Sequence, residues 1–524
     1  MFIPNIGIIF VLEIKNKLKN KIMFKPNTLF YSDGYKIGHR AMMAPNVKKL
    51  YGTWIPRSLK HGPDGVTKIV SFGQHLTWKW LHDEFEENFF KQDKSIAIKF
   101  ANDMSKYLGM DYDGSHFKEL HELGYLPIKV KSLPEGIETY PNIAHMTFIN
   151  TIDGFAWLTL YLETIVSSLA WKPCTSATIA KRFRRNAENW VKKTDPDNMW
   201  LVDYMCHDFS ARGLNPWDML SSGLGHARSF RGSDTLIVIP AARYFYGESE
   251  NEVIINSVNA SEHSVSTTCI FTMGELEMLR YWMRKFPVGI LSCVMDTMDL
   301  TRVVKPEPDG YLSILKDEIL ARDGKIVIRP DSSPNGLTPV DIICGHNNEL
   351  SERELQANYP DFYRKGLVEC LWEIFGGTIN NQGYKVLSPK IGCIYGDAIT
   401  IKRQIEIYER LADKGFASTN ITVGVGSFTY QVNSRDSLGF AAKGGWFESK
   451  DGEFAIYKDP VTDSGTKKSP KGLVGVFKDD NGEFIMRDEL TKEEEKTGIL
   501  EVIYKNGKFY NEPVFSEIRE RLDK

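Results

Sequence analysis

Three arginines stand next to glycines or carboxylates, a setting in which a guanidinium often binds phosphate. They are Arg212 in HDFSARG, Arg329 in IRPD and Arg435 in GVGSFTYQVNSRD. The planar fork of arginine can contact two phosphate oxygens at once. A single arginine is more often part of a surface ion pair, but two of these follow expected strands. Together they indicate a site for a phosphorylated ligand.

Four aspartates lie at the ends or edges of expected strands: Asp234, Asp296, Asp331 and Asp397. A carboxylate in this position can bind sugar hydroxyls, orient a histidine or hold magnesium. It can also simply cap the next helix, and for one aspartate the two interpretations are equally good. Four of them favour a polyhydroxyl, cationic or metal-bound ligand.

A glycine-rich turn, Gly424-Val425-Gly426-Ser427, follows another apolar run. Such a turn lets backbone N–H groups approach a phosphate closely. The motif is weak alone, and Arg435 on the following segment strengthens it.

One histidine, His263 in NSVNASEHSV, stands between a loop of small residues and a helical pattern. Most single histidines are structural, but this loop would present the ring at a surface. A neutral imidazole there can act as a nucleophile toward phosphate or as an acid/base group.

These residues follow short apolar runs that alternate with helical patterns, which predicts a parallel α/β arrangement. The expected strands are 199–206, 235–239, 290–295, 325–328, 391–395 and 421–425, and the clearest helices are 275–284 and 400–414. So many units favour a β/α barrel over an open sheet, with the active site at the carboxyl ends of the strands.

We therefore expect a β/α-barrel-like catalytic domain at 191–439 and a second, mixed α+β domain formed by 23–190 together with 440–524. Hairpin signals such as Asp451-Gly452 and Asn506-Gly507 support strands in the second domain. Residues 1–22 match neither a secretory signal nor a membrane span. We expect them to be either a loosely docked tail or a mis-called extension ahead of a start at Met23, and the two interpretations are equally good.

The bulk composition is that of a globular protein. The 524 residues carry a formal net charge of -3, which argues against a nucleic-acid partner. Seven scattered cysteines form no C-x-x-C pair, so a disulfide framework is not expected and a reducing compartment, the cytoplasm, is. No membrane association is expected.

Nine stretches together resemble the nicotinamide phosphoribosyltransferases, which are type II phosphoribosyltransferases. They are YSDGYKIGH at 31–39, HDFSARG at 207–213, FRGSDT at 230–235, SVNASEHS at 257–264, VMDTMD at 294–299, IRPDS at 328–332, GDAIT at 396–400, NSRD at 433–436 and YKDPVTD at 457–463. They follow the order and spacing of that family from about residue 27 to residue 521.

The resemblance implies a nicotinamide site. Phe209 would stack on one face of the ring, and Tyr35 from the second subunit of a homodimer would cover the other face. Asp234 would accept a hydrogen bond from the carboxamide and would repel the carboxylate of nicotinate. Arg212 and Arg329 would bind near the ring amide and the pyrophosphate.

The resemblance also implies a site for phosphoribosyl pyrophosphate at the subunit interface. Asp331, Gly396 and Asp397 would hold the ribose hydroxyls. The 5′-phosphate would lie among Arg57, Gly426, Arg435 and Lys443. At Ser427-Phe428 the chain departs from the family, which usually continues with glycines there.

In the family's reaction, pyrophosphate leaves an oxocarbenium-like ribose and nicotinamide attacks C1, giving nicotinamide mononucleotide for NAD salvage. Magnesium and the arginines would neutralise the leaving group, and no residue is assigned as a dedicated metal ligand. ATP would phosphorylate His263, whose ring Asp296 would orient.

Three alternatives remain open at this point. Nicotinate phosphoribosyltransferase shares the fold and the phosphoribosyl donor, and Asp234 with the aromatic pair argues against it. A catalytically idle metabolite-binding protein would not need His263 and the strand-end carboxylates. An unrelated barrel lyase would want a Schiff-base lysine or a metal cluster, and too few lysines and histidines lie at the strand ends for one.

Overall fold

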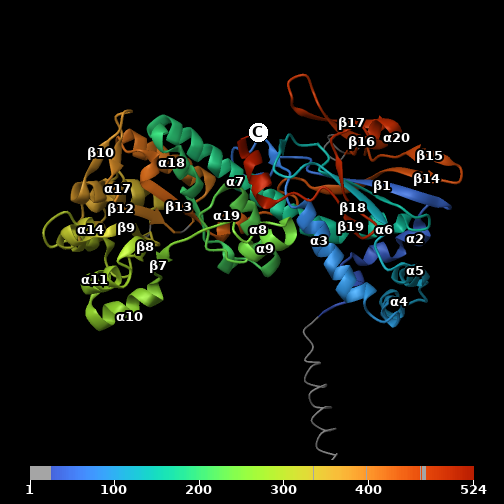
Figure 1. Cartoon of the computed structure of the whole chain (residues 1–524), viewed down its shortest axis with the longest axis horizontal. Coiled ribbons are helices and arrows are strands. Elements are labelled where there is room, and N and C mark those ends of the chain that lie inside the picture. The colour runs from blue at the N-terminus through green and yellow to red at the C-terminus, as the bar shows by residue number, and fades with distance from the viewer. Residues whose placement is uncertain (1–24, 334–335, 397, 461, 463–467, 524) are drawn as a thin grey trace, which may run out of the picture.

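The computed structural model describes residues 25–333, 336–396, 398–460, 462 and 468–523. Asp397 and the expected tail at 1–22 therefore lie outside the described residues. Figure 1 shows two lobes, one built on a parallel sheet (the barrel lobe) and one on an antiparallel sheet (the sheet lobe), with α7, α8, α9 and α19 between them in this view. None of the helices in the described residues has the length and apolar character needed to cross a bilayer.

The parallel sheet has the strand order β6-β13-β12-β9-β8-β7. Its strands are β6 (Cys206–Asp208), β7 (Asn259–Ala260), β8 (Val288–Val294), β9 (Asp323–Arg329), β12 (Ile391–Tyr395) and β13 (Ile421–Val425). Isolated parallel bridges, Asp208 to Ser233 and Gly232 to Asn256, continue the pairing from β6 toward the residues before β7. The predicted β/α-barrel-like architecture is confirmed.

Helices connect these strands, because a connection between parallel strands must cross back to the other end of the sheet. They are α8 (Pro216–Ser229), α9 (Val238–Tyr246), α10 (His263–Met273), α11 (Glu275–Lys285), α12 (Leu300–Val303), α13 (Tyr311–Ile314), α14 (Lys316–Ala321), α15 (Pro339–Cys344), α16 (Glu352–Leu355), α17 (Phe362–Phe375), α18 (Ile401–Asp413) and α19 (Ser427–Gln431). A small hairpin of β10 (Gly377–Ile379) and β11 (Lys385–Leu387) and the short helix η6 (Ser418–Asn420) complete the lobe.

Two expected strands are wrong. The run 199–206 is mostly the 3-10 helix η4 (Pro196–Tyr204), and β6 begins only at Cys206. Pro196 at the start of that helix presets its backbone. The run 235–239 turns into α9, whose buried residues Val238, Ala241, Ala242 and Phe245 recur with helical spacing. The β-branched residues alone did not reveal this period.

The antiparallel sheet has the order β15-β14-β1-β5-β3-β18-β19. Its strands come from both ends of the chain: β1 (Val47–Ile55), β3 (Ile128–Ser132), β5 (Met146–Asn150), β14 (Ala441–Ser449), β15 (Gly452–Ala455), β18 (Glu501–Lys505) and β19 (Lys508–Phe509). The hairpins expected at Asp451-Gly452 and Asn506-Gly507 are the β14–β15 and β18–β19 connections.

The two faces of the antiparallel sheet are covered differently. Trp54, Met146 and Phe148 point into one core, which they share with the surrounding helices. Those helices are η1 (Thr28–Phe30), η2 (Gly34–Gly38), α2 (His39–Met42), α3 (Gln74–Phe85), η3 (Glu86–Phe90), α4 (Ser95–Leu108), α5 (Ser115–Leu123) and α6 (Ala156–Tyr161). Tyr51 and Trp446 pack on the other face, against the β16–β17 hairpin (Leu473–Lys478 and Phe484–Leu490) beside α20 (Lys492–Glu495).

The long helix α7 (Glu163–Thr194) belongs to both lobes. Its first half contributes Leu169 and Cys174 to the sheet-lobe core, and its second half contributes Phe183 and Val191 to the barrel core. The expected domain boundary at 190–191 falls inside this helix. Short elements β2 (Ile69–Val70), β4 (Glu138–Thr139), α21 (Phe515–Glu520) and η7 (Arg521–Asp523) complete the chain.

Candidate active site

Phe209 and Arg329 meet at the carboxyl ends of the parallel strands. Phe209 follows β6, and its backbone N–H donates to the Val425 carbonyl at 2.9 Å. The Arg329 guanidinium, at the end of β9, lies 4.5 Å from the centre of the Phe209 ring. A Cβ at Gly424 would lie only 2.8 Å from that ring. A glycine in β13 thus lets the aromatic side chain lie across the strand end.

Asp234 lies beside this aromatic group and is held by two donors. Its Oδ1 lies 2.9 Å from His207 Nε2 and accepts a hydrogen bond from Ser257 Oγ at 2.5 Å. Burial raises the pKa of Asp234, but the hydrogen bonds from His207 and Ser257 and the charges of His207 and Arg329 outweigh it, so the pKa falls below its ordinary value. The carboxylate therefore stays ionised near neutral pH.

His207 was missed by the reasoning from sequence. Its ring centre lies 4.6 Å from that of Phe209. The two residues are two apart, so a strand places both on the same face. That spacing was the available signal.

Asp208 is a second missed residue, and its part is structural. It is fully buried and accepts hydrogen bonds from the Ser210 amide and the Thr235 hydroxyl at 2.9 and 2.7 Å. Its carbonyl accepts the Asp234 N–H at 3.0 Å. Asp208 thereby ties the turn after β6 to the turn that carries Asp234.

His263 and Asp296 come together at neighbouring strand ends. His263 is the first residue of α10, and its Nε2 lies 3.6 Å from Asp296 Oδ1, while Nδ1 lies 3.0 Å from Thr297 Oγ1. The imidazole is 43% exposed, whereas the Asp296 side chain is only 5% exposed. A buried carboxylate thus faces an accessible ring.

Asp296 also positions the loop after β9. Its Oδ2 accepts the backbone N–H groups of Asp331 and Ser332, each at 2.8 Å, and the Ser332 hydroxyl at 2.6 Å. Its Oδ1 is buried and accepts no hydrogen bond from the described residues. This carboxylate therefore links the histidine to the loop that carries Asp331.

Gly396 leaves room for the Arg329–Asp331 pair. Arg329 Nη2 lies 3.5 Å from Asp331 Oδ1. A Cβ at Gly396 would lie 2.4 Å from that oxygen and 2.7 Å from Arg329 Nε. No larger residue fits at Gly396 unless the pair moves.

A separate group of cations, the basic cluster, lies on the sheet lobe. Lys443 on β14 has Arg57, Lys458 and Arg435 as charged neighbours. Burial lowers the pKa of Lys443 most, Glu163 opposes this, and the three other cations lower it further. Arg57 Nε donates to the Gly439 carbonyl at 3.1 Å, and Arg435 pairs at 3.0 Å with Asp436. Lys458 was missed; it lies in the YKDPVTD motif.

Two expected residues, Tyr35 and Arg212, make no hydrogen bond, ion pair or ring contact with the aromatic group among the described residues of one chain. Tyr35 is on η2 of the sheet lobe and is 67% exposed, with His39 and Lys36 as its ring neighbours. Arg212 is exposed on η5 (Ala211–Gly213), next to α19. Gly426 directly precedes α19, on which Phe428 is 57% exposed.

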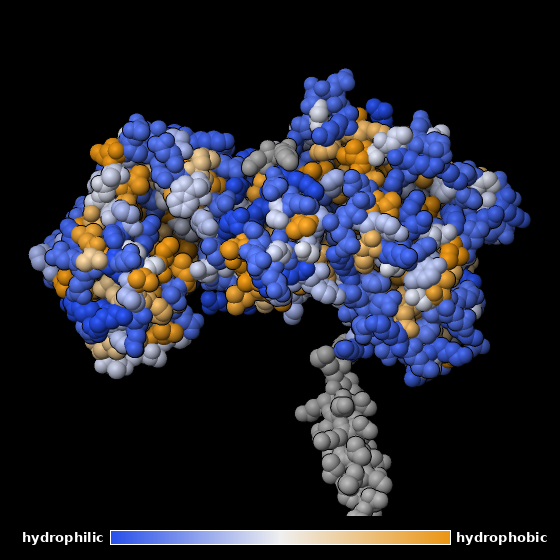
Figure 2. Space-filling view, viewed as in Figure 1, coloured by the Kyte–Doolittle hydropathy of each residue, from blue (hydrophilic) through white to orange (hydrophobic). Residues whose placement is uncertain are grey.

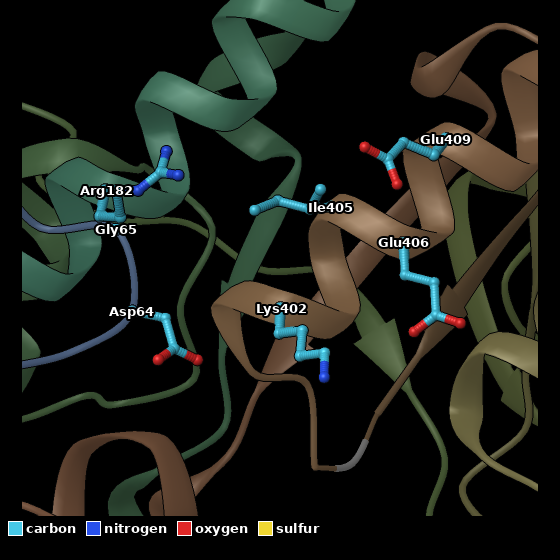
Figure 3. Close-up of a pocket in the computed structure, with 7 residues that line it drawn as sticks. All are labelled: Asp64, Gly65, Arg182, Lys402, Ile405, Glu406 and Glu409. Carbon is cyan, nitrogen blue, oxygen red and sulfur yellow. The ribbon is translucent and has the colours of Figure 1, made fainter.

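A groove of about 610 Å³ lies away from these residues, between the loop after β1, helix α7 and helix α18. Figure 3 shows Asp64, Gly65 and Arg182 on one wall and Ile405 and Lys402 on the other. None of its lining residues is among the predicted site residues.

Comparisons with known proteins identify the family of this chain. Residues 204–497 match the model of the Nicotinate phosphoribosyltransferase (NAPRTase) family. The nicotinamide phosphoribosyltransferase of Acinetobacter baylyi is 39% identical, over 95% of this chain and 97% of its own length. That of Mycoplasma pneumoniae is 32% identical, over 85% of this chain and 94% of its own.

Among solved structures, the nicotinate-nucleotide pyrophosphorylase of Pyrococcus furiosus superposes with a TM-score of 0.54 at 14% identity, covering 96% of both chains. At that identity the likeness concerns the fold alone. The family match spans more than half of this chain and includes the β6, β8, β9, β12 and β13 strand ends described above. The chain therefore belongs to the nicotinate phosphoribosyltransferase family of pentosyltransferases.

Proposed function

We propose that this enzyme transfers the phosphoribosyl group of phosphoribosyl pyrophosphate to nicotinamide, giving nicotinamide mononucleotide and pyrophosphate for NAD salvage. In this reaction the C1–oxygen bond of the ribose breaks and its electron pair leaves with pyrophosphate. The pyridine nitrogen then forms the new bond to C1 with its lone pair. The relatives named nicotinamide phosphoribosyltransferase support this substrate.

The observation that carries the choice of nicotinamide is the ionised Asp234 beside Phe209. A carboxylate can accept a hydrogen bond from the carboxamide NH2, but it repels the carboxylate of nicotinate. Its own donors, His207 and Ser257, hold it in one orientation. A fixed negative charge would therefore lie beside the substituent of a ring stacked on Phe209 and would favour an amide over a carboxylate.

The residues at the strand ends suit the departure of pyrophosphate. Arg329 lies between the ring site and Asp331, so its charge can stabilise the leaving group. Asp331, Gly396 and Asp397 would hold the ribose hydroxyls. Magnesium, which neutralises pyrophosphate when bound, would be held by the carboxylate of Asp331.

The proposal includes a homodimer with active sites at the interface. The basic cluster suits the 5′-phosphate, and Tyr35 would cover the nicotinamide in the partner's site. Tyr35 is exposed and lies on the other lobe from its own chain's Phe209. The barrel lobe also exposes apolar residues, among them Phe271 of α10 at 80% and Val288 at 60%, and hydrophobic residues are visible on that lobe in Figure 2.

We further propose that ATP phosphorylates His263. A proton on Nε2 would face Asp296 and leave the Nδ1 lone pair to attack the γ-phosphorus, which breaks its bond to the bridging oxygen and releases ADP. The exposed imidazole and buried Asp296 support this assignment. The free cysteines, of which all but Cys269 are buried, support a cytoplasmic location.

The test is a competition between substrates. Purified protein is incubated with phosphoribosyl pyrophosphate, magnesium and equimolar nicotinamide and nicotinate, with and without ATP, and the mononucleotide is identified by mass. Nicotinamide mononucleotide, increased by ATP, is expected. Nicotinate mononucleotide as the main product would instead assign the enzyme to the other substrate.

A variant tests the histidine separately. His263→Ala should lose both ATP hydrolysis and the stimulation by ATP while keeping basal synthesis. Normal synthesis with undiminished ATP hydrolysis in this variant would refute the assignment of His263.

A further inference from the structure

The antiparallel sheet carries a second pocket, and none of its lining residues belongs to the strand-end site. Its volume is about 220 Å³, and it opens on the face that the β16–β17 hairpin covers only in part. Cross-strand pairing builds its floor: Tyr51 pairs with both Trp446 and Ile149, and Lys129 pairs with Ile149. Directly paired residues share a face, so these side chains line one surface by register.

The floor of this pocket is aromatic and apolar. Tyr51 and Trp446 are only 3% and 6% exposed, and Leu473 beside them is 5% exposed. The Tyr51 hydroxyl donates to the Val474 carbonyl at 3.3 Å. A flat ring entering the pocket would therefore meet apolar side chains.

The rim is dominated by positive charge. Four lysines and two glutamates line the pocket: Lys129, Lys131, Lys492, Lys496, Glu493 and Glu495. Both glutamates are already engaged, because Glu495 pairs with the buried Lys131 at 2.8 Å and Glu493 pairs with Lys496 at 2.7 Å.

Lys492 is also satisfied. It pairs with Glu448 and Glu453 at the edge of the sheet, at 3.1 and 2.6 Å, and its Nζ lies 5.0 Å from the Trp446 ring centre.

Lys129 is the exception among the four. It makes no side-chain hydrogen bond or ion pair with any residue that the structure describes, although it is partly buried. Burial lowers its pKa most, Glu495 opposes this, and Lys131, Lys505 and Lys496 lower it further. Placing an ammonium among like charges and away from water costs free energy unless an anion accompanies it.

We propose that this pocket binds a small organic anion, a carboxylate or phosphate attached to one flat ring. Lys129 would be the partner of the acidic group, and Trp446 with Tyr51 would form the wall for the ring. The volume equals that of roughly seven water molecules, which suits one ring with its acidic group and excludes a dinucleotide. This inference does not depend on the proposed reaction.

The experiment uses the full-length protein and calorimetric titration with four probes. Benzoate and phenyl phosphate carry a ring and a charge, benzyl alcohol carries only the ring, and inorganic phosphate carries only the charge. At least one ring anion should bind about tenfold more tightly than both benzyl alcohol and inorganic phosphate. Failure of both ring anions to do so overturns the proposal.

Variants place the binding in this pocket rather than at the phosphate sites of the active centre. Lys129→Gln should weaken binding of the ring anion at least tenfold, whereas Lys129→Arg should keep the binding of the wild type. Two controls should leave this binding unchanged: Lys508→Gln, which alters an exposed lysine on the same sheet, and Arg435→Gln, which alters the basic cluster. Undiminished binding in Lys129→Gln would refute the assignment.

Stability separates a binding role from a structural one. Removing a charge that has no partner relieves repulsion, so Lys129→Gln without any anion should have a Tm no lower than that of the wild type. A clearly lower Tm would mean that Lys129 already has a partner in the free protein, which contradicts the proposal.

Discussion

At the barrel end the carboxylates of Asp234 and Asp296 are held by hydrogen-bond donors, whereas on the sheet lobe four cations lie near one another. Asp234 is held by His207 and Ser257, and Asp296 by the amides after β9. In the basic cluster, Lys443 has Arg57, Arg435 and Lys458 as neighbours and only Glu163 as a nearby acid. The acidic groups of the barrel end are therefore already held in place by neighbouring groups, while in the cluster we propose that a bound phosphate adds negative charge to that of Glu163 and Asp436.

The consequence is a difference in what a substitution should disturb. At a site whose groups are already in place, a substitution should mainly weaken stabilisation of the transition state and reduce substrate specificity. In a cluster of like charges, one substitution weakens ligand binding but relieves repulsion in the free protein. The following variants test that difference, beginning with the strongest effect.

Arg329→Gln should have the largest effect, lowering kcat/KM by about 10³-fold, since it removes the positive charge that we propose stabilises the departing pyrophosphate. Steady-state rates with nicotinamide measure it. Arg243→Gln, an exposed arginine of α9, is the control. A loss of less than tenfold would show that the Arg329 charge is not used in the transition state.

Asp234→Asn should lower kcat/KM for nicotinamide by about 10²-fold. It should also reduce the preference of the enzyme for nicotinamide over nicotinate. The amide keeps the size of the side chain but removes the negative charge that repels a carboxylate. The ratio of the two mononucleotides from an equimolar mixture is the measurement. An unchanged ratio would mean that Asp234 does not select the substrate.

Glu275 at the start of α11 breaks the pattern of matched charges in the barrel lobe. Burial raises its pKa to about 7, Asp299 and Asp296 add to this, and Arg302 opposes it. The pKa of Glu275 is therefore higher in the folded protein than in the unfolded chain. Its contribution to the stability of the fold is fully present below about pH 4.5 and is lost as the pH rises through about 7.

Glu275→Gln mimics the protonated acid, so its free energy of unfolding should exceed that of the wild type by about 2 kcal/mol at pH 8 and by little at pH 5. Urea unfolding at both pH values measures the difference, with the exposed Glu520→Gln as the control. An equal difference at pH 5 and pH 8 would contradict the assigned ionisation.

Lys443→Gln should have the smallest catalytic effect, raising the KM for phosphoribosyl pyrophosphate about tenfold with little change in kcat. Its Tm should not fall, because one repelling charge is removed. Kinetics at two salt concentrations also report the weaker electrostatic attraction. A falling Tm with an unchanged KM would show that Lys443 has a structural role instead.

Much of the candidate site follows from residue type and position after a strand. Phe209, Arg329, Asp296 and Asp331 come after runs whose carboxyl ends meet in the structure. The contribution of His207 was not apparent, because its partner Asp234 is 27 residues away and comes near only through the bridge between Asp208 and Ser233. Asp397 lies outside the described residues, so its part remains a prediction.

The sequence by itself determined the family, the alternation of buried strands and helices in the barrel, and the hairpins of the sheet lobe, since these depend on local order and spacing. Only the tertiary structure decided that 235–239 enters a helix, that α7 joins both cores and that Lys129 has no ion-pair partner among the described residues. Those outcomes depend on packing and charge between segments far apart in the chain, and a linear pattern does not contain such distances.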